Sequence, residues 1–230
     1  MTPLSAVVFD LDGTLYDTRR MRRTFLPRLV LRAVWRPLEA ARAIAVLRHY
    51  RRAHEALRGV RAPTLAEQQL QLAADHSGHP VDVVREIIAD WFERAPLAAV
   101  RSAARPGLAD ALAALRAGGL RTALLSDYPP LPKLEALAMR QAFDAIAWAQ
   151  QPEIGALKPD PAGLLHVLAS LQVHPSAALY VGDRPDVDVG VARRAGCRVA
   201  LIGDHAPADS DVPRFDDLSA LTAWLLRAVP

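Results

Sequence analysis

The sequence predicts an α/β fold, a doubly wound and mostly parallel sheet with an all-α segment inserted after the first strand. Short apolar runs, several ending in an acidic or hydroxyl residue, alternate with segments of helical length, and this alternation is typical of βαβ units. Residues 19–101 break the alternation, because no strand pattern stands out there. We therefore expect a core domain of residues 1–18 and 102–230 and a cap domain of residues 19–101.

The first expected strand runs from Ala6 to Phe9, a run too short for a helix and β-branched at Val7 and Val8. Such a run suits a strand that is buried on both faces. Further strands are expected over residues 121–126, 145–149, 177–181 and 198–202. Helices are expected over residues 107–118, 133–139, 161–171, 187–195 and 218–229, where apolar periodicity is bounded by proline, glycine or N-cap residues.

The inserted segment reads as helices over residues 19–58, interrupted near Pro37, and over residues 64–76 and 81–94. Hinges are expected near residues 17–20 and 101–105. Between residues 19 and 61 the chain carries 13 arginines against two acids, Glu39 and Glu55. This basic surface is either solvated or meets anions, and an anionic substrate, an acidic partner and an anionic membrane surface remain alternatives.

Composition excludes several classes of protein. The chain has 230 residues, of which 51% are hydrophobic, enough for a large core. A net charge of +3 gives no general case for binding nucleic acid. The single cysteine, Cys197, excludes an internal disulfide and a cysteine-rich zinc site. We find no signal-like segment and no apolar run long enough for a membrane span, so we expect a cytoplasmic protein and leave its oligomeric state open.

Acidic residues follow the first strand directly. Asp10 and Asp12 stand at its end, with Gly13 and Thr14 after them. A simple Asp-Gly turn would explain a bare pair of acids. However, the carboxyl ends of parallel strands meet at one edge of a sheet, where ligands bind, and later strands carry matching groups at their ends. These are Ser126 and Asp127, Asp183 with Asp188 nearby, and Lys158 in the loop before a helix.

Three carboxylates at one edge need a cation, because they cannot all stay ionised beside one another. Oxygen ligands without histidine or cysteine favour Mg²⁺ over zinc, and Mg²⁺ is commonly completed by a substrate phosphate. One carboxylate is then free to act as a nucleophile. The sequence therefore predicts a site for Mg²⁺ and phosphate at this edge.

The order of these groups resembles the haloacid dehalogenase superfamily, in the branch with a helical cap inserted after the first motif. Together the matches run from residue 5 to about residue 203. The first motif is matched by Asp10-Leu11-Asp12-Gly13-Thr14-Leu15, the second by Ser126, the third by Lys158, and the fourth by Gly182-Asp183 with Asp188.

The resemblance implies a role for each residue. Asp10 attacks phosphorus and forms an aspartyl-phosphate, while Asp12 protonates the leaving oxygen and then activates water. Thr14, Ser126 and Lys158 hold the phosphoryl group. The metal ligands are the Asp10 side chain, the Asp12 backbone carbonyl and Asp183, with Asp188 as a direct or indirect partner.

Two details of the resemblance lead to further expectations. Dehalogenating members lack an acid at the position of Asp12, so its presence favours phosphoryl transfer. For its role as a proton donor, Asp12 needs a raised pKa, which we expect its acidic neighbours to provide. Many relatives carry asparagine where this chain has Asp127, and we expect Asp127 to point away from the phosphate and cap a turn.

The main prediction is a Mg²⁺-dependent phosphatase that acts on a small phosphorylated metabolite. A phosphomutase or phosphotransferase acting on sugar phosphates is one alternative. A binding or regulatory protein whose basic cap meets an acidic partner, nucleic acid or a membrane surface is another. Which phosphomonoester is the substrate does not follow from the sequence.

Overall fold

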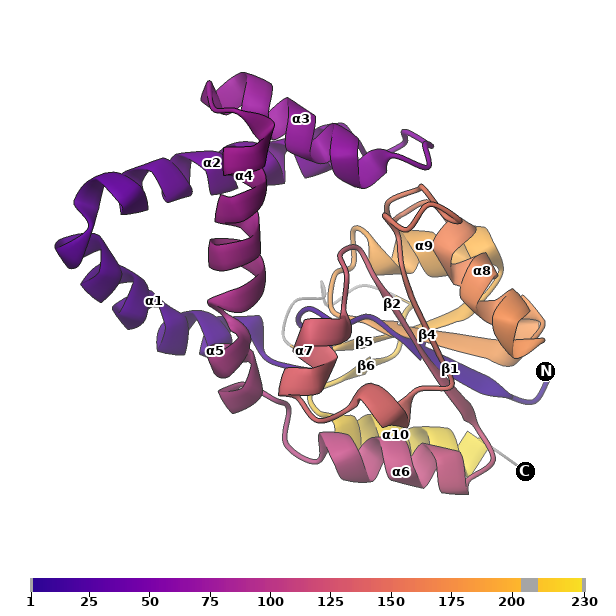
Figure 1. The fold of residues 1–230 in the computed structure, drawn as a ribbon. Coiled ribbons are helices and arrows are strands. Elements are labelled where there is room, and N and C mark those ends of the chain that lie inside the picture. Colours follow the sequence, from indigo (N-terminus) through magenta and orange to yellow (C-terminus); the bar gives the residue numbers. More distant parts are fainter. Residues whose placement is uncertain (1, 204–210, 229–230) are drawn as a thin grey trace.

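A computed structural model describes residues 2–203 and 211–228 of the chain. Over these residues it contains a six-stranded, wholly parallel sheet with strand order β3-β2-β1-β4-β5-β6 (Figure 1). Helices cover both faces, so the predicted fold class is confirmed. The strands are β1 (Ala6–Phe9), β2 (Arg121–Ser126), β3 (Ala145–Trp148), β4 (Ala178–Gly182), β5 (Arg198–Ile202) and β6 (Arg214–Phe215). Of these strands, only β6, which is two residues long, was not predicted from the sequence.

The central strand β1 divides its side chains between two hydrophobic clusters. Val7 and Phe9 pack on the face covered by α6 (Leu108–Ala117) and α10 (Leu218–Ala228). Ala6 and Val8 pack on the face covered by α8 (Ala162–Leu171) and α9 (Asp188–Ala195). Burial on both faces explains why this strand reads as a continuous apolar run.

Strand register decides what meets at the carboxyl edge of the sheet. Phe9 is level with Leu124 of β2 and with Val181 of β4. The residue after β1, Asp10, donates its backbone N–H to the carbonyl of Val181 at 2.8 Å. The loops after β1, β2 and β4 therefore begin side by side.

All elements between β1 and β2, a stretch described without gaps, are helical. They are α1 (Thr18–Trp35), α2 (Pro37–Ala56), α3 (Leu65–Ser77), α4 (Val81–Ile87), the π-helix η1 (Ile88–Arg94), α5 (Leu97–Ser102) and α6. Asp17 caps α1 by accepting hydrogen bonds from the backbone N–H groups of Arg19 and Arg20 at 2.7 and 3.0 Å. Pro37 starts α2 and excludes helical geometry at Arg36, which separates the two long helices.

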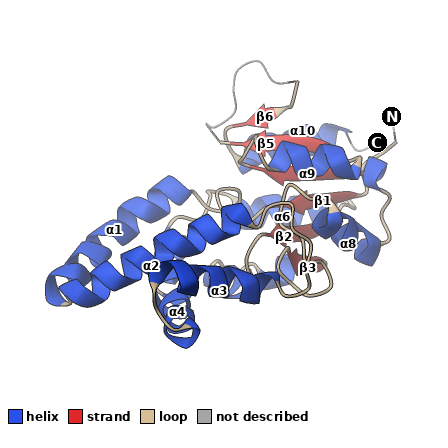
Figure 2. Ribbon diagram, turned by 90° about the horizontal axis from the view of Figure 1, so that it is seen from above, coloured by secondary structure: helices blue, strands red, loops and turns tan. Residues whose placement is uncertain are grey.

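The helices α1 to α4 extend away from the sheet (Figure 2). The two connecting segments run side by side, because Asp17 donates its backbone N–H to the carbonyl of Ala103 at 2.9 Å and Arg105 donates to that of Leu15 at 3.0 Å. The domain boundaries at residues 18/19 and 101/102 remain a proposal, and α5 runs across the second.

The remaining short helices are α7 (Leu131–Ala136), η2 (Arg140–Ala142) and η3 (Pro175–Ala177). Among the described helices, none combines the length and the apolar character that crossing a membrane requires.

Candidate active site

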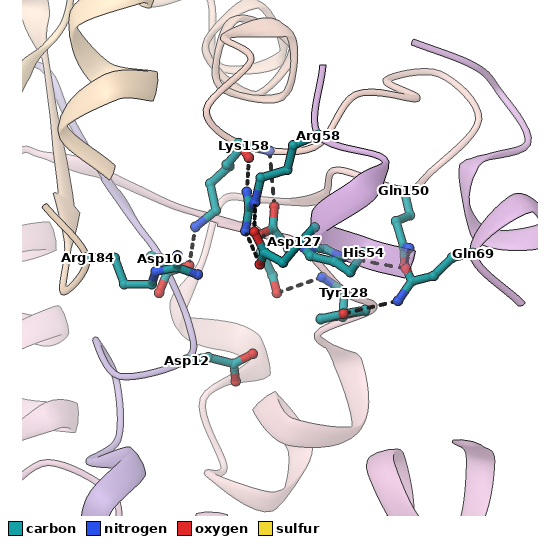
Figure 3. A network of polar contacts seen from close by, with 12 residues as sticks. Asp10, Asp12, His54, Arg58, Gln69, Asp127, Tyr128, Gln150, Lys158 and Arg184 are labelled. Carbon is teal, nitrogen blue, oxygen red and sulfur yellow. Dashed lines mark hydrogen bonds and ion pairs between the residues drawn. The ribbon is translucent and has the colours of Figure 1, made fainter. Parts of the chain in front are cut away.

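Asp10 and Lys158 form a buried ion pair at the carboxyl edge of the sheet (Figure 3). Their side chains are 7% and 6% exposed, and Lys158 Nζ lies 2.5 Å from Asp10 Oδ1. Thr14, in the loop after β1, donates its hydroxyl to Asp10 Oδ2 at 3.2 Å. Both carboxylate oxygens of Asp10 are therefore held in a fixed orientation.

The loop between β4 and α9 brings two more carboxylates to this point. Asp188 Oδ2 accepts hydrogen bonds from the backbone N–H groups of Asp183 and Arg184 at 3.1 and 2.9 Å, and its Oδ1 lies 3.1 Å from Lys158 Nζ. Asp188 thus fixes the loop and the lysine together. In contrast, Asp183 Oδ1 is buried and has no hydrogen-bond partner.

Gly13 makes room for Asp183. Its φ of +96° lies in the left-handed region, and a Cβ at this position would overlap the Asp183 carboxylate. Arg105 holds the Gly13 loop in place by donating to the backbone carbonyls of Thr14 and Gly13 at 2.9 and 2.7 Å. The glycine of the first motif is therefore required for close approach as well as for the turn.

The crowded carboxylates affect one another's ionisation. Burial raises the pKa of Asp10 well above its usual value, against the attraction of Lys158, and Asp188 and Asp183 raise it further. Burial, together with the charge of Asp188, raises the pKa of Asp183 to about 7. Negative charge in this pocket exceeds what one lysine neutralises.

A divalent cation fits this arrangement. Carboxylate oxygens of Asp10, Asp183 and Asp188 lie within 4.8 Å of one another and are buried. Asp183 Oδ1 is buried without a hydrogen-bond partner and can accept a ligand. An all-oxygen donor set suits a hard ion such as Mg²⁺.

Asp12 turns away from this cluster. Its carboxylate oxygens lie 2.6 and 2.9 Å from Lys133 Nζ on α7, and the hydroxyl of Tyr16 donates to the same carboxylate. Burial alone would raise the pKa of Asp12, but the charge of Lys133 and the hydrogen bonds from Lys133 and Tyr16 lower it. The expectation that acidic neighbours raise this pKa is therefore wrong, because Lys133 on α7 and the hydrogen bonds to the carboxylate outweigh the effect of burial.

Sequence reasoning did not assign Lys133 to the site. Its one available signal was that the chain has only two lysines, Lys133 and Lys158. No motif spacing connects position 133 with Asp12; the packing of α7 against α5 and the loop after β1 brings them together.

Asp127 joins the core to the cap helices instead of capping a turn. Its Oδ1 accepts a hydrogen bond from the Lys158 backbone N–H at 3.2 Å, and its Oδ2 lies 3.3 Å from His54 Nε2 and 3.8 Å from Arg58 Nη2 (Figure 3). Burial would raise the pKa of Asp127, but the His54 hydrogen bond and the charges of Lys158, His54 and Arg58 lower it to about 2. This carboxylate therefore stays ionised between the two parts.

Ser126 is buried, and its hydroxyl oxygen accepts a hydrogen bond from the Tyr128 backbone N–H at 3.2 Å. Tyr128 in turn stacks on His54 with ring centroids 4.7 Å apart and accepts a hydrogen bond from Gln69 of α3 at 3.2 Å. The loop after β2 is thus tied to the cap at several points, while the role of Ser126 toward phosphate remains a prediction.

A cavity of about 1000 Å³ connects the acidic cluster with the cap. Asp10, Asp183 and Lys158 line its inner end. Its outer wall is largely apolar with basic residues interspersed, and includes Phe25, Leu47, Trp91, Arg22 and Arg48. The cap therefore provides most of the surface that a substrate would meet beyond its reacting group.

Comparison with known proteins identifies the family. The family model described as haloacid dehalogenase-like hydrolase matches residues 4–196. The chain belongs to the haloacid dehalogenase-like hydrolases. This finding confirms the resemblance stated from the motifs.

Two relatives at 30% identity or more are phosphoglycolate phosphatases. The chain is 31% identical over 223 residues to phosphoglycolate phosphatase from Nitrosospira multiformis, covering 93% of this chain and 89% of that protein. It is 30% identical to phosphoglycolate phosphatase from Pseudomonas putida, covering 94% of this chain and 77% of that protein. The expected enzyme class, a phosphatase of this family, is thereby confirmed.

A solved structure shares the fold over nearly the whole chain. The 2-haloacid dehalogenase from Pseudomonas syringae pv. Tomato superposes with a TM-score of 0.66 at 25% identity, covering 97% of this chain and 99% of that one. Helical cap and core are thus both within the aligned length.

Proposed function

We propose that this protein is a Mg²⁺-dependent phosphatase that hydrolyses a small phosphomonoester through an aspartyl-phosphate on Asp10. The observation that carries the proposal is the convergence of Asp10, Asp183 and Asp188 around Lys158, with one buried carboxylate oxygen of Asp183 unpartnered. The cytoplasm is the proposed location.

Asp10 is the proposed nucleophile, because Lys158 and Thr14 aim its carboxylate and it lines the cavity. Lys158 also neutralises charge on the phosphoryl oxygens, and Thr14 and Ser126 complete their binding. We assign Asp188 to holding Lys158 and the Asp183 loop.

The proposed metal ligands are Asp10, Asp183 and the backbone carbonyl of Asp12, with Asp188 beside them. When bound, Mg²⁺ would offset the negative charge of the substrate phosphate and of the carboxylates.

Asp12 is the proposed proton donor to the leaving oxygen and the base for the attacking water. Lys133 and Tyr16 hold its carboxylate, so transfer requires a proton that Asp12 takes up as substrate displaces Lys133 or that Lys133 itself supplies. The acid at this position supports phosphatase chemistry over dehalogenation, in agreement with the two phosphoglycolate phosphatases that the chain resembles.

Phosphoglycolate, named for both relatives, is one candidate substrate. A panel assay of phosphate release should contain it together with sugar phosphates and a generic aryl phosphate. We expect turnover that requires Mg²⁺ and that Asp10→Asn lowers by at least about a thousandfold. Asp75→Asn, on the exposed surface of α3, should leave turnover unchanged.

Two results would contradict the proposal. One is turnover that survives Asp10→Asn, and the other is equal turnover after removal of divalent metal. Formation of an isomeric sugar phosphate without phosphate release would instead indicate the phosphomutase.

A further inference from the structure

The outer end of the cap carries large apolar side chains in solvent. Trp35 closes α1 and Leu38 lies in the first turn of α2, and they are 78% and 87% exposed. Val30, Leu31 and Val34 on α1 are 62%, 61% and 72% exposed. Figure 1 shows that the corner between α1 and α2 projects away from the sheet. We call these five side chains the tip.

The tip is not the packing surface of α1. α1 packs against the other cap helices through Leu29 and Ala33, which contact the hydrophobic cluster of Ala40, Ala43 and Trp91. Val30 and Val34 lie on a different face of α1, together with Pro27, Arg23 and Arg20, because a spacing of three and four residues places these side chains along one face of a helix. This face is apolar at the tip and basic nearer the core.

Unpaired positive charge lies along the helical hairpin formed by α1 and α2, from the tip toward the core. Among the described residues, eight exposed arginines of α1 and α2 form no ion pair, namely Arg20, Arg22, Arg23, Arg28, Arg42, Arg48, Arg51 and Arg52. The only acids of these two helices are Glu39 and Glu55, which pair with Arg32, Arg36 and Arg58. A strong positive field therefore extends along the whole hairpin.

We propose that the tip docks on an anionic lipid surface, with Trp35, Leu38 and the valines in the interface and the arginines at the headgroups. Exposed aromatic and aliphatic residues bury apolar area at a membrane surface, and arginines near them are attracted to anionic headgroups. The proposal uses both the apolar and the basic character of the face. No tip residue lines the cavity, whereas four of the arginines, Arg22, Arg48, Arg51 and Arg52, do. The apolar tip residues can therefore be tested separately from catalysis.

Other occupants explain the surface less well. A second copy of the chain would bring like-charged hairpins together, which is unfavourable. A nucleic acid or an acidic protein segment would pair with the arginines but would leave Trp35 and Leu38, at a protruding corner, without an apolar partner.

The test uses the full chain and vesicles of phosphatidylcholine with or without phosphatidylglycerol. We expect flotation with the anionic vesicles, weakened by salt because screening shortens the range of the arginine charges. Trp35 is highly exposed whereas Trp91, Trp148 and Trp224 are buried or half-buried. Lipids brominated in the acyl chain should therefore quench emission in the wild type and much less in Trp35→Ser.

Matched variants separate the tip from general hydrophobicity. Leu38→Ser should lower vesicle partitioning by about tenfold or more, as expected for an apolar side chain leaving the lipid interface. Leu165→Ser, an equivalent change at a 41% exposed leucine of α8 on the core, should not. Both variants should keep wild-type hydrolysis of a soluble aryl phosphate, which also reports correct folding.

Absence of binding to anionic vesicles at low salt would overturn the proposal. So would equal losses in Leu38→Ser and Leu165→Ser, or a wild-type dimer in gel filtration that Leu38→Ser converts to monomer, because that result assigns the tip to a second copy.

Discussion

The clearest prediction for the buried acidic cluster concerns Asp183, because its ionisation is linked to both stability and metal binding. Its carboxyl has an ordinary pKa of 3.8 and a pKa of about 7 in the folded chain, raised first by burial and then by Asp188. The folded state therefore keeps a proton that the unfolded state releases. This stabilisation is complete below the unfolded pKa and is lost as pH rises through about 7.

The size of the effect follows from the shift. Between about pH 5 and about pH 7 only the unfolded state is ionised, and each pH unit changes the free energy of unfolding by about 1.4 kcal/mol. Metal-free wild-type protein should thus lose up to about 3 kcal/mol across this window through Asp183. The Asp183→Asn side chain cannot ionise, so the free energy of unfolding of this variant should fall correspondingly less.

Urea unfolding in the presence of a chelator, at a series of pH values, measures this difference directly. Adding Mg²⁺ should reverse the trend for the wild type, since the metal binds the ionised carboxylate and is favoured at higher pH. Asp183→Asn should show little stabilisation by Mg²⁺. If both proteins lose the same free energy between about pH 5 and about pH 7, the buried Asp183 carboxyl is not the titrating group and the reasoning fails.

Three further predictions concern the surroundings of the cluster. Gly13→Ala forces a Cβ against the Asp183 carboxylate, so we expect kcat/KM to fall by at least about a hundredfold. Lys133→Met removes the charge that lowers the pKa of Asp12, so the limb of the pH–rate profile that depends on Asp12 should move to higher pH. Asp127→Asn removes an acid with a pKa of about 2, so stability should fall by about 1–3 kcal/mol at neutral pH. Because that pKa is depressed, the loss should diminish as pH falls below the ordinary pKa of the carboxyl.

Each of these has a matched control or a contradicting result. Gly59 also has a positive φ, +87°, so Gly59→Ala carries a similar backbone strain, but its Cβ would meet no atom within 4 Å. Gly59→Ala should lower the stability of the fold but leave the rate per folded molecule unchanged. If kcat/KM falls equally in Gly13→Ala and Gly59→Ala, the contact with the Asp183 carboxylate is not the reason for the loss. An unshifted profile in Lys133→Met would exclude Lys133 as the controlling charge. Unchanged stability in Asp127→Asn would show that the contact of Asp127 with the cap helices is not maintained in solution.

Much of the core could be predicted because its signals are local. A strand buried on both faces must be apolar throughout, and a parallel sheet needs helices between its strands. These constraints reveal β1, β2 and β5 with their observed ends. The strand β6 was missed because two residues carry no periodicity. The continuous helix expected over residues 81–94 is an α-helix followed by a π-helix, a difference in backbone hydrogen bonding that apolar spacing does not record.

Candidate site residues at strand ends could likewise be named, because register in a parallel sheet places all those ends at one edge. This reasoning brought Asp10, Lys158 and Asp183 together, as the structure does. It failed for contacts between elements that no periodicity links. His54 reaches Asp127 from a helix 73 residues away in sequence, and that contact depends on how the cap is set against the core.

The sequence by itself determined the fold class, the family and the acids at the carboxyl edge, since local pattern and strand register suffice for these. Tertiary structure alone decided which lysine each acid contacts. Lys158 draws Asp10 toward Asp188, while Lys133 draws Asp12 away. Tertiary structure also decided which hydrophobic residues of the Arg-rich helices remain in solvent, because a helix with apolar residues on two sides buries only the side that finds a partner.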